Sequence, residues 1–382
     1  RFMDRRGFVT SGMAAGLMGL GAGGTALGGL VRAGSGLGVG KTLPDGTVRL
    51  SSNENPLGIS PAAREAVVAS LVDANRYPFS FSGPLYDALT AHLGVKRENV
   101  ILGAGSTEIL RMAVHAWQAP DAPLVVAEPT FEDVLDYQDP LPYELIKIPL
   151  TADHAHDLGR MRETVEEQRR PSVVYICNPN NPTGTITPSA ELDDWIRDAP
   201  ETVMFLVDEA YYEYADHPDY GSAISWIEEK PNVIVARTFS KIYAMAGLRL
   251  GYAVAHPSSI RRLGQFVCQN NPNIPAGAAA TASLTDAGLI DRSVAVNAES
   301  KEIVHTTLDE LGLEYLPTQA NFIMHRVHGD LGTYRDRMRE RGLLVGRDFP
   351  PMLEWNRLSF GLPDEMDRWA SALKDLRRMG QI

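Results

Sequence analysis

The chain has 382 residues, of which 44% are hydrophobic and 22% charged, and its 36 Lys and Arg against 48 Asp and Glu give a formal net charge of −12. This composition excludes a wholly disordered chain and provides enough apolar material for two domains or one large one. The acidic balance argues against a nucleic-acid-binding protein, because phosphate contacts need clustered Lys and Arg. Two cysteines, Cys177 and Cys268, are too few for a disulfide framework or a zinc site. We expect both to be buried, and we expect no metal site.

The first forty residues differ in composition from the rest of the chain. Arg5 and Arg6 precede Phe8, and residues 12–40 are almost entirely Gly, Ala, Leu, Met and Val, with Arg32 as the only charge. A basic stretch followed by a weakly apolar one and small residues predicts an export signal, and the paired arginines resemble the twin-arginine type. A membrane anchor and a flexible cytosolic tail are the alternatives. We expect a periplasmic or otherwise exported protein, with a cytoplasmic location as the alternative, and no membrane span in the mature chain.

After this segment, short apolar runs alternate with amphipathic ones. Ser60 and Pro61 predict the start of a helix, with Ser as the N-cap and Pro at the first helical position. Further helices are expected at 106–117, 131–137, 161–169 and 189–198, and strands at 47–51, 123–127, 143–148, 172–177, 203–207 and 232–236. This alternation predicts βαβ units and an α/β fold with a mostly parallel sheet that is covered by helices on both faces.

From about residue 257 the pattern changes to longer helices with a few strands. Helices are expected at 293–311, 333–341 and 363–379, and strands at 314–316, 321–326 and 357–360. We therefore expect four parts, which are the export signal and linker at 1–40, an N-terminal segment at 41–75 that contributes to a small domain, a large domain at 76–256 and a small α+β domain at 257–382.

Polar residues follow three of the predicted strands directly. The strand at 172–177 is followed by 178–184 (NPNNPTG), the strand at 203–207 by Asp208 and Tyr211, and the strand at 232–236 by Ser240 and Lys241. Each of these alone could be a turn, a helix cap or a solvated lysine. Ligands bind outside the carboxyl ends of the strands in open α/β sheets, so the three sets are expected to meet. An amine, a carboxylate, a phenol and hydroxyls at one sheet edge are the groups that pyridoxal phosphate needs.

The chain resembles the fold-type I pyridoxal-phosphate aminotransferases, and its motifs are most similar to those of the histidinol-phosphate aminotransferases. The resemblance covers about residues 47–380. It depends on a combination of motifs, which are SNENPLG at 52–58, RYP at 76–78, GAGSTE at 103–108, NPNNPTG at 178–184, VDEAY at 207–211, SK at 240–241, AGLR at 246–249 and RLSFG at 357–361.

The resemblance implies a role for each matching residue. Lys241 would hold the cofactor covalently and move the proton at the substrate Cα, and Asp208 would pair with the ring nitrogen. Asn181 and Tyr211 would bond the phenolic oxygen, and Phe131 would stack on the ring. The cofactor phosphate would be bound by Gly105, Ser106, Thr107, Thr238, Ser240 and Arg249.

The resemblance also implies substrate and partner contacts. Arg357 would bind a carboxylate or phosphate of the substrate, and Arg326, Asn321 and Asn55 are further substrate-binding candidates. Tyr77 would reach the phosphate of the neighbouring subunit, which implies a homodimer. The chain departs from the family pattern at Ala104, Thr107 and Phe131, where Asn, Asp and Tyr are common.

We therefore expect a pyridoxal-phosphate-dependent aminotransferase that exchanges an amino group between a small-molecule amino donor and a 2-oxo acid such as 2-oxoglutarate. Histidinol phosphate is the donor that the family favours. An aromatic or other amino-acid aminotransferase and a lyase or decarboxylase of the same fold are the alternatives within the fold. A binding or regulatory protein without turnover is an alternative of another class.

Overall fold

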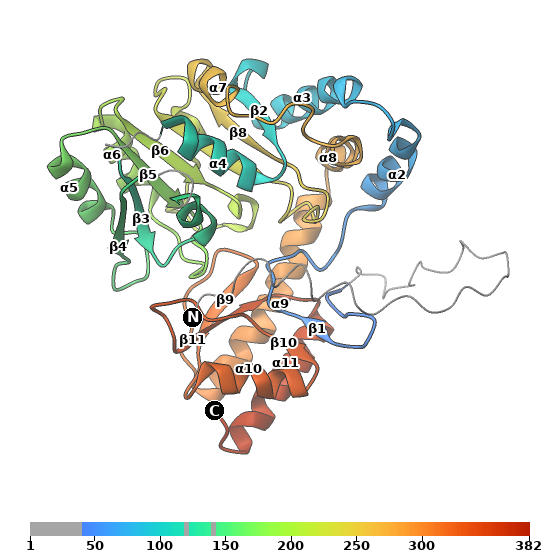
Figure 1. Cartoon of the computed structure of the whole chain (residues 1–382). Coiled ribbons are helices and arrows are strands. Elements are labelled where there is room, and N and C mark those ends of the chain that lie inside the picture. Colours follow the sequence, from blue (N-terminus) through green and yellow to red (C-terminus); the bar gives the residue numbers. More distant parts are fainter. Residues whose placement is uncertain (1–39, 118–121, 139–142) are drawn as a thin grey trace. The chain divides into compact units, whose positions relative to one another are not determined.

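A computed structural model describes residues 40–117, 122–138 and 143–382 (Figure 1). Apart from Gly40, the predicted export signal lies outside the described residues. The described residues belong to one compact unit, so the predicted domain boundaries at 75/76 and 256/257 stay predictions. Among these residues, no helix combines the length and the apolar character that a membrane crossing requires.

The central element of the described residues is a seven-stranded mixed sheet in the order β2-β8-β7-β6-β5-β3-β4. Strands β3 to β7 run parallel, and β8 is antiparallel to both β2 and β7. The mostly parallel sheet that the sequence predicted is thereby confirmed. The strands span Val100–Gly103 (β2), Leu124–Glu128 (β3), Leu145–Pro149 (β4), Ser172–Cys177 (β5), Val203–Asp208 (β6), Val233–Thr238 (β7) and Gly251–Ala255 (β8).

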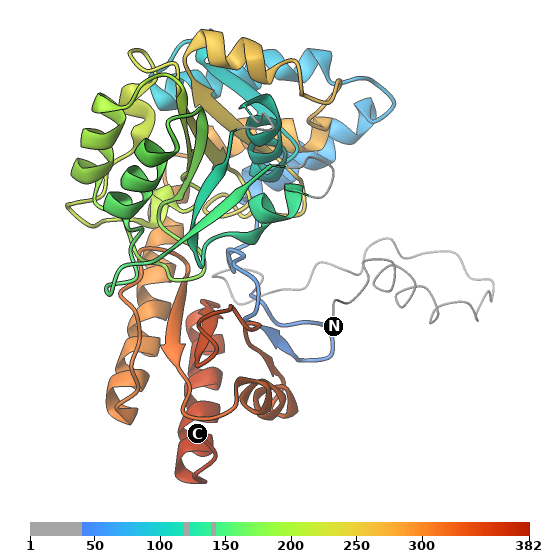
Figure 2. The ribbon, with the colours of Figure 1, turned by 60° about the vertical axis from the view of Figure 1, so that its left-hand side comes forward.

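Helices cover both faces of this sheet because successive side chains of each strand point to opposite faces. Leu124 and Val126 of β3 pack in one apolar core with α4 (Ser106–Trp117) and α7 (Pro257–Leu263). Val125 packs in the core on the opposite face with α5 (Leu158–Gln168) and α6 (Ser189–Asp198). Figure 2 shows α4 (teal) and the two green helices on opposite sides of the sheet.

A third core lies at the β2–β8 edge of the sheet. Here α8 (Ile274–Thr285) packs against both α2 (Pro61–Ser70) and α3 (Phe79–Leu93). The Ser60 hydroxyl accepts a hydrogen bond from the Ala63 N–H, which confirms the predicted N-cap of α2. Short 3₁₀ helices join the elements at Leu71–Asp73, Arg97–Asn99, Tyr212–Tyr214 and Ala223–Trp226.

The remaining core lies around two small sheets. One pairs β1 (Val48–Arg49) with β10 (Leu343–Leu344) in parallel, and the other pairs β9 (Phe322–Arg326) with β11 (Trp355–Ser359) antiparallel. Helices α10 (Leu331–Glu340) and α11 (Pro363–Arg378) pack there with the C-terminal half of α9 (Leu289–Leu311). The N-terminal half of α9 packs in the α2–α3–α8 core instead, so this one helix links the two regions (Figures 1 and 2).

Three expectations differ from the structure. The helix predicted at 131–137 is a 3₁₀ helix, η3 (Glu132–Gln138). The strand predicted at 314–316 is reduced to a single bridge between Tyr315 and His325, because the chain there meets β9 at one position only. Cys177 is buried as expected, but Cys268 is exposed in the segment before α8.

Candidate active site

A cavity of about 360 Å³ opens at the carboxyl ends of β5, β6 and β7. Its size lies within the range of small-molecule sites. The structure brings together at this cavity eleven of the residues that the sequence singled out. They are Ser106, Thr107, Phe131, Asn181, Asp208, Tyr211, Thr238, Ser240, Lys241, Arg249 and Arg357.

Asp208 is the last residue of β6 and is 2% exposed. The Tyr175 hydroxyl donates to Asp208 Oδ2 at 2.9 Å, and the Ala210 N–H donates to Oδ1 at 3.2 Å. Burial raises the pKa of Asp208 to about 6, and the two hydrogen bonds oppose that rise. The carboxylate is therefore ionised at neutral pH and can face a cationic ring nitrogen, because a carboxylate can accept about four hydrogen bonds.

Lys241 follows β7 and contributes its amine to the cavity wall. Burial, and then the charge of Arg357, lower the pKa of the Lys241 amine to about 8. The Lys241 Nζ donates to the carbonyl of Asn53 at 3.2 Å. Two more basic side chains bind the preceding backbone carbonyls. Lys41 Nζ donates to the Ser52 carbonyl at 2.8 Å, and Arg357 Nη2 donates to the Ser51 carbonyl at 3.1 Å. The three consecutive backbone carbonyls at 51–53 thus each accept a hydrogen bond from a basic side chain.

The turn between β2 and α4 forms a second wall of the cavity. Gly105 has a φ of +79°, and a Cβ there would collide with the guanidinium of Arg249. Arg249 has a φ of 58°, which is rare for a residue with a side chain. Its guanidinium donates to the Ala246 carbonyl at 2.9 Å and lies 3.5 Å from the Ser240 hydroxyl. With the N-terminus of α4 at Ser106, these groups form an anion-binding wall.

Arg357 on β11 approaches the cavity from the opposite side. It is 9% exposed, and its Nη1 donates to the amide oxygen of Asn181 at 2.7 Å. This bond leaves the Asn181 amide N–H groups to donate into the cavity. The guanidinium carbon lies 4.6 Å from the centre of the Phe349 ring. Burial lowers the pKa of Arg357 to about 10, and its Nε is buried without a partner among the described residues.

Sequence reasoning missed two important wall residues, Arg347 and Asn53. Arg347 follows β10 and forms an ion pair with Glu132 of η3 through both guanidinium nitrogens, Nη1 with Oε1 at 3.2 Å and Nη2 with Oε2. Asn53 belongs to the motif SNENPLG at 52–58 but was not among the predicted site residues. The only available signal for Arg347 was an arginine after a short apolar run, which is too common to be specific.

Five predicted residues do not line the cavity. Arg326 is partly exposed and binds Glu314 and Glu354 at 2.9 and 2.7 Å, and its predicted substrate role stays a prediction. The remaining four are the backbone turn Gly105, the buried Asn55 and Asn321, and Tyr77, which is 68% exposed.

The two buried asparagines have partners elsewhere. The Asn55 amide donates to the Ile242 carbonyl and to the Ser293 hydroxyl, and Asn321 donates to the Glu54 carbonyl. Neither residue lines the cavity, and the predicted substrate role of Asn55 and Asn321 stays a prediction.

The wall residues fit pyridoxal phosphate. Lys241 supplies an amine and Asp208 a buried carboxylate that lacks a cationic partner within hydrogen-bond distance. Asn181 supplies amide N–H groups. The Gly105 turn packs so closely against Arg249 that any side chain at this position would displace the guanidinium from beside the N-terminus of α4. The donor set thus includes partners for the aldehyde, the ring nitrogen, the phenolic oxygen and the phosphate of this cofactor.

Comparisons with known proteins agree with this geometry. Residues 45–373 match the family described as aminotransferase class I and II. A histidinol-phosphate aminotransferase of Moorella thermoacetica is 39% identical over 299 residues, which are 78% of this chain and 77% of the relative. Histidinol-phosphate aminotransferase 1 of Cupriavidus pinatubonensis is 37% identical and covers 86% of this chain and 88% of its own. The crystal structure of histidinol-phosphate aminotransferase from Sinorhizobium meliloti with pyridoxal-5'-phosphate is 28% identical, with a TM-score of 0.81, and covers 87% of this chain and 90% of that one.

Proposed function

Because this chain belongs to the class I and II aminotransferases, which use pyridoxal phosphate, we propose that it transfers the amino group of histidinol phosphate to a 2-oxo acid such as 2-oxoglutarate. One observation carries the choice of donor. Besides Arg249, which belongs to the proposed site of the cofactor phosphate, two guanidinium groups, those of Arg347 and Arg357, line the same cavity as Lys241. Guanidinium groups bind phosphate and carboxylate in a bidentate manner, so this pair suits a phosphorylated donor and a dicarboxylic acceptor in turn.

The cofactor, when bound, supplies the electron-withdrawing ring that makes the Cα proton of the donor acidic. The Lys241 Nζ accepts and returns that proton, for which a pKa of about 8 is suitable near neutral pH. Asp208 holds the cationic ring nitrogen, and Asn181 and Tyr211 donate to the phenolic oxygen. Arg357 orients the carboxylate of the 2-oxo acid.

The phosphate of the donor would bind at Arg347. The carboxylate of Glu132 already occupies this guanidinium, so an incoming phosphate has to replace it. A dianionic phosphate carries more charge than a carboxylate and offers three acceptor oxygens, which favours the exchange.

A screen of single half-reactions tests the proposed donor. The protein loaded with pyridoxal phosphate is mixed separately with histidinol phosphate, phenylalanine, tyrosine and aspartate, and the absorbance of the cofactor reports its conversion to the amine form. Histidinol phosphate is expected to convert it fastest. Failure of histidinol phosphate with success of an aromatic amino acid would overturn the donor but not the aminotransferase. Release of carbon dioxide would instead identify a decarboxylase.

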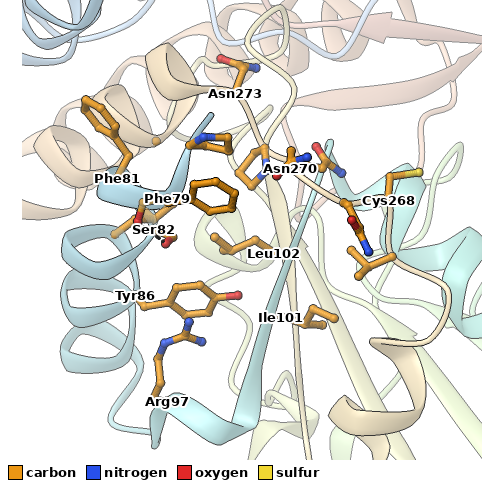
Figure 3. Close-up of a pocket in the computed structure, with 17 residues that line it drawn as sticks. Phe79, Phe81, Ser82, Tyr86, Arg97, Ile101, Leu102, Cys268, Asn270 and Asn273 are labelled. Carbon is orange, nitrogen blue, oxygen red and sulfur yellow. Dashed lines mark hydrogen bonds between the residues drawn. The ribbon is translucent and has the colours of Figure 1, made fainter. Parts of the chain in front are cut away.

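We further propose a homodimer to which Tyr77 contributes. Large apolar side chains are exposed around α2 and the start of α3, among them Val68 (64%), Val72 (82%) and Phe79 (74%). A groove beside them is lined by Phe79 and Tyr86 of α3 on one side and by the segment before α8 on the other (Figure 3). Exposed apolar clusters of this kind are typical of protein interfaces.

Sedimentation analysis tests the dimer. Val72→Asp is expected to give monomers with reduced activity, because a charge in an apolar interface is costly. Met379→Asp, at another exposed apolar residue, serves as the matched control and should sediment like the unaltered protein. A monomeric unaltered protein with full activity would contradict the proposal.

We also propose that the first forty residues direct export. The paired Arg5 and Arg6 ahead of an apolar stretch support this, and lysine at both positions should block a twin-arginine route. Cell fractionation of the full chain and of the double-lysine variant tests the proposal. Equal cytoplasmic retention of both would contradict it.

A further inference from the structure

Asn53 contacts two of the proposed catalytic groups from a position that is 6% exposed. Its backbone carbonyl accepts the Lys241 amine at 3.2 Å, and its side-chain Nδ2 donates to the Tyr211 hydroxyl oxygen at 3.0 Å. No other described residue forms hydrogen bonds with both groups. Asn53 is therefore placed to affect both the amine and the phenol of the site.

The direction of these hydrogen bonds determines where the Tyr211 proton points. Asn53 Nδ2 donates to the Tyr211 oxygen at 3.0 Å, and Asn53 Oδ1 accepts from the Ser359 hydroxyl on β11 at 2.6 Å. An amide nitrogen can only donate, so the Tyr211 oxygen accepts. The Tyr211 hydroxyl proton finds no acceptor among the described residues and is available to the cavity, which Tyr211 lines.

Packing fixes the rest of Tyr211. Its ring is 3% exposed and lies edge-on to Phe322 of β9, with the centroids 5.1 Å apart. Burial raises the pKa of its hydroxyl further above the ordinary value of 10, so the proton stays on the oxygen at neutral pH. With the ring held and the proton retained, the remaining freedom is rotation of the hydroxyl, and Asn53 removes it.

From this geometry we infer that Asn53 is a positioning residue, and that Ser359 and Asn53 together orient the Tyr211 hydroxyl so that it donates to the phenolic oxygen of the cofactor. The inference rests on the proposed function, because it takes that oxygen to lie beside Tyr211. A hydrogen-bond donor stabilises the negative charge on this oxygen. That charge is largest when the nitrogen that would link Lys241 to the cofactor is deprotonated, and the pKa of the link is the pKa of this nitrogen. Loss of the donor therefore raises the pKa of the link.

A double-mutant cycle on Asn53 and Tyr211 tests the inference. The pKa of the link is read from the pH dependence of the cofactor absorbance in the resting protein, and the dissociation constant of the cofactor from the cofactor-free protein is measured alongside. Tyr211→Phe is expected to raise the pKa by about one unit. Asn53→Ala should raise it in the same direction, and Asn53→Ala in the Tyr211→Phe background should add nothing.

Asn55→Ala is the matched control. Asn55 is a buried asparagine of the same segment, but its amide donates to Ile242 and Ser293 instead. This variant is expected to lower the unfolding temperature without a shift of the pKa. Ser359→Ala, which removes a single hydroxyl, should shift the pKa by a smaller amount, and it carries the test if Asn53→Ala does not fold.

The possible failures can be told apart. Equal shifts from Asn53→Ala in both backgrounds, or no shift from Asn53→Ala and Ser359→Ala, would overturn the inference. No shift from Tyr211→Phe itself would overturn the proposed placement of the phenolic oxygen. Neither result depends on which amino donor the protein uses.

Discussion

Tyr175 on β5 donates a hydrogen bond of 2.9 Å to the carboxylate of Asp208 on β6, between two strands that are buried along their whole length. Tyr175 is fully buried, and Asp208 lies opposite Cys177, two residues beyond Tyr175 in the register, so the side chains of Tyr175 and Asp208 are on the same face of the sheet. The bond therefore lies on the side of Asp208 that belongs to the sheet. It stabilises the ionised carboxylate without occupying the cavity.

Tyr175→Phe is expected to raise the pKa of Asp208 above its present value of about 6, because the hydroxyl that stabilises the carboxylate is lost. Cofactor affinity should fall about three- to tenfold near pH 6.5 and recover by pH 8.5, where Asp208 is ionised in either protein. Titration of the cofactor-free protein with pyridoxal phosphate at both pH values measures this. Tyr334→Phe, a buried tyrosine of another core, should leave both values unchanged. An equal loss at both pH values would contradict the prediction.

The stability of the cofactor-free protein should depend on pH through Asp208. Its folded pKa of about 6 lies above the unfolded value of 3.8, so its contribution to stability is present below about pH 4 and is lost as the pH rises through 6. The loss is at most about 3 kcal/mol. Asp208→Asn does not titrate, so its free energy of unfolding relative to the unaltered protein should increase between pH 4 and pH 7. Denaturant unfolding at several pH values measures the difference, with the exposed Glu201→Gln as the control that should show no such trend.

Arg347 and Arg326 should differ in their effect on catalysis. Arg347→Ala is expected to lower kcat/KM for histidinol phosphate about 10- to 100-fold, mainly through KM, because a charge-assisted contact to the phosphate is lost. Arg326→Ala removes two exposed ion pairs and should change kcat/KM less than about twofold. Steady-state kinetics of the two variants measures which arginine contributes more to kcat/KM. A larger effect of Arg326→Ala would support the role that the sequence suggested.

Glu132→Gln is expected to lower KM for the phosphorylated donor a few-fold. Glu132 holds Arg347 in the free protein, and the neutral amide competes less well with a phosphate. The KM for an aromatic amino acid, whose side chain carries no phosphate, is measured in the same protein. It serves as the reference and should not fall. An increase in KM for the phosphorylated donor would indicate that Glu132 positions Arg347 instead of competing for it.

The sequence was most informative where function depends on strand ends. Asn181, Asp208 and Lys241 follow apolar runs that could only be buried parallel strands, and parallel strands bring their carboxyl ends to one edge. It was least informative where position depends on distant packing. Arg347 and Asn53 reach the cavity only because the two small sheets pack beside the large one, and nothing local in the sequence encodes that contact.

Arg326 illustrates the limit of motif matching. It lies opposite Trp355 in the β9–β11 pair, whereas Arg357 lies opposite Met324. Arg326 and Arg357 are therefore on the same face of this sheet, but Arg326 is two residues further from the cavity, which is about 7 Å along a strand. Helices α3 and α8 were not predicted from the sequence, and each of these omissions has a local cause. Helix α3 contains Pro84, which usually ends a helix, and α8 is mostly small residues without a polar face.

The carbonyls at 51–53 have a consequence for the rate of ligand capture. A carbonyl is a neutral acceptor, so binding to the carbonyls of Asn53 and Ser51 does not neutralise Lys241 and Arg357, unlike pairing with a carboxylate. Four basic side chains line the cavity against three acidic ones, so the cavity is more positive than the chain as a whole, whose net charge is −12; the residues are Lys241, Arg249, Arg347 and Arg357 against Glu132, Asp133 and Asp208. Anionic ligands should be drawn in by this local charge, and their association should slow as the salt concentration rises.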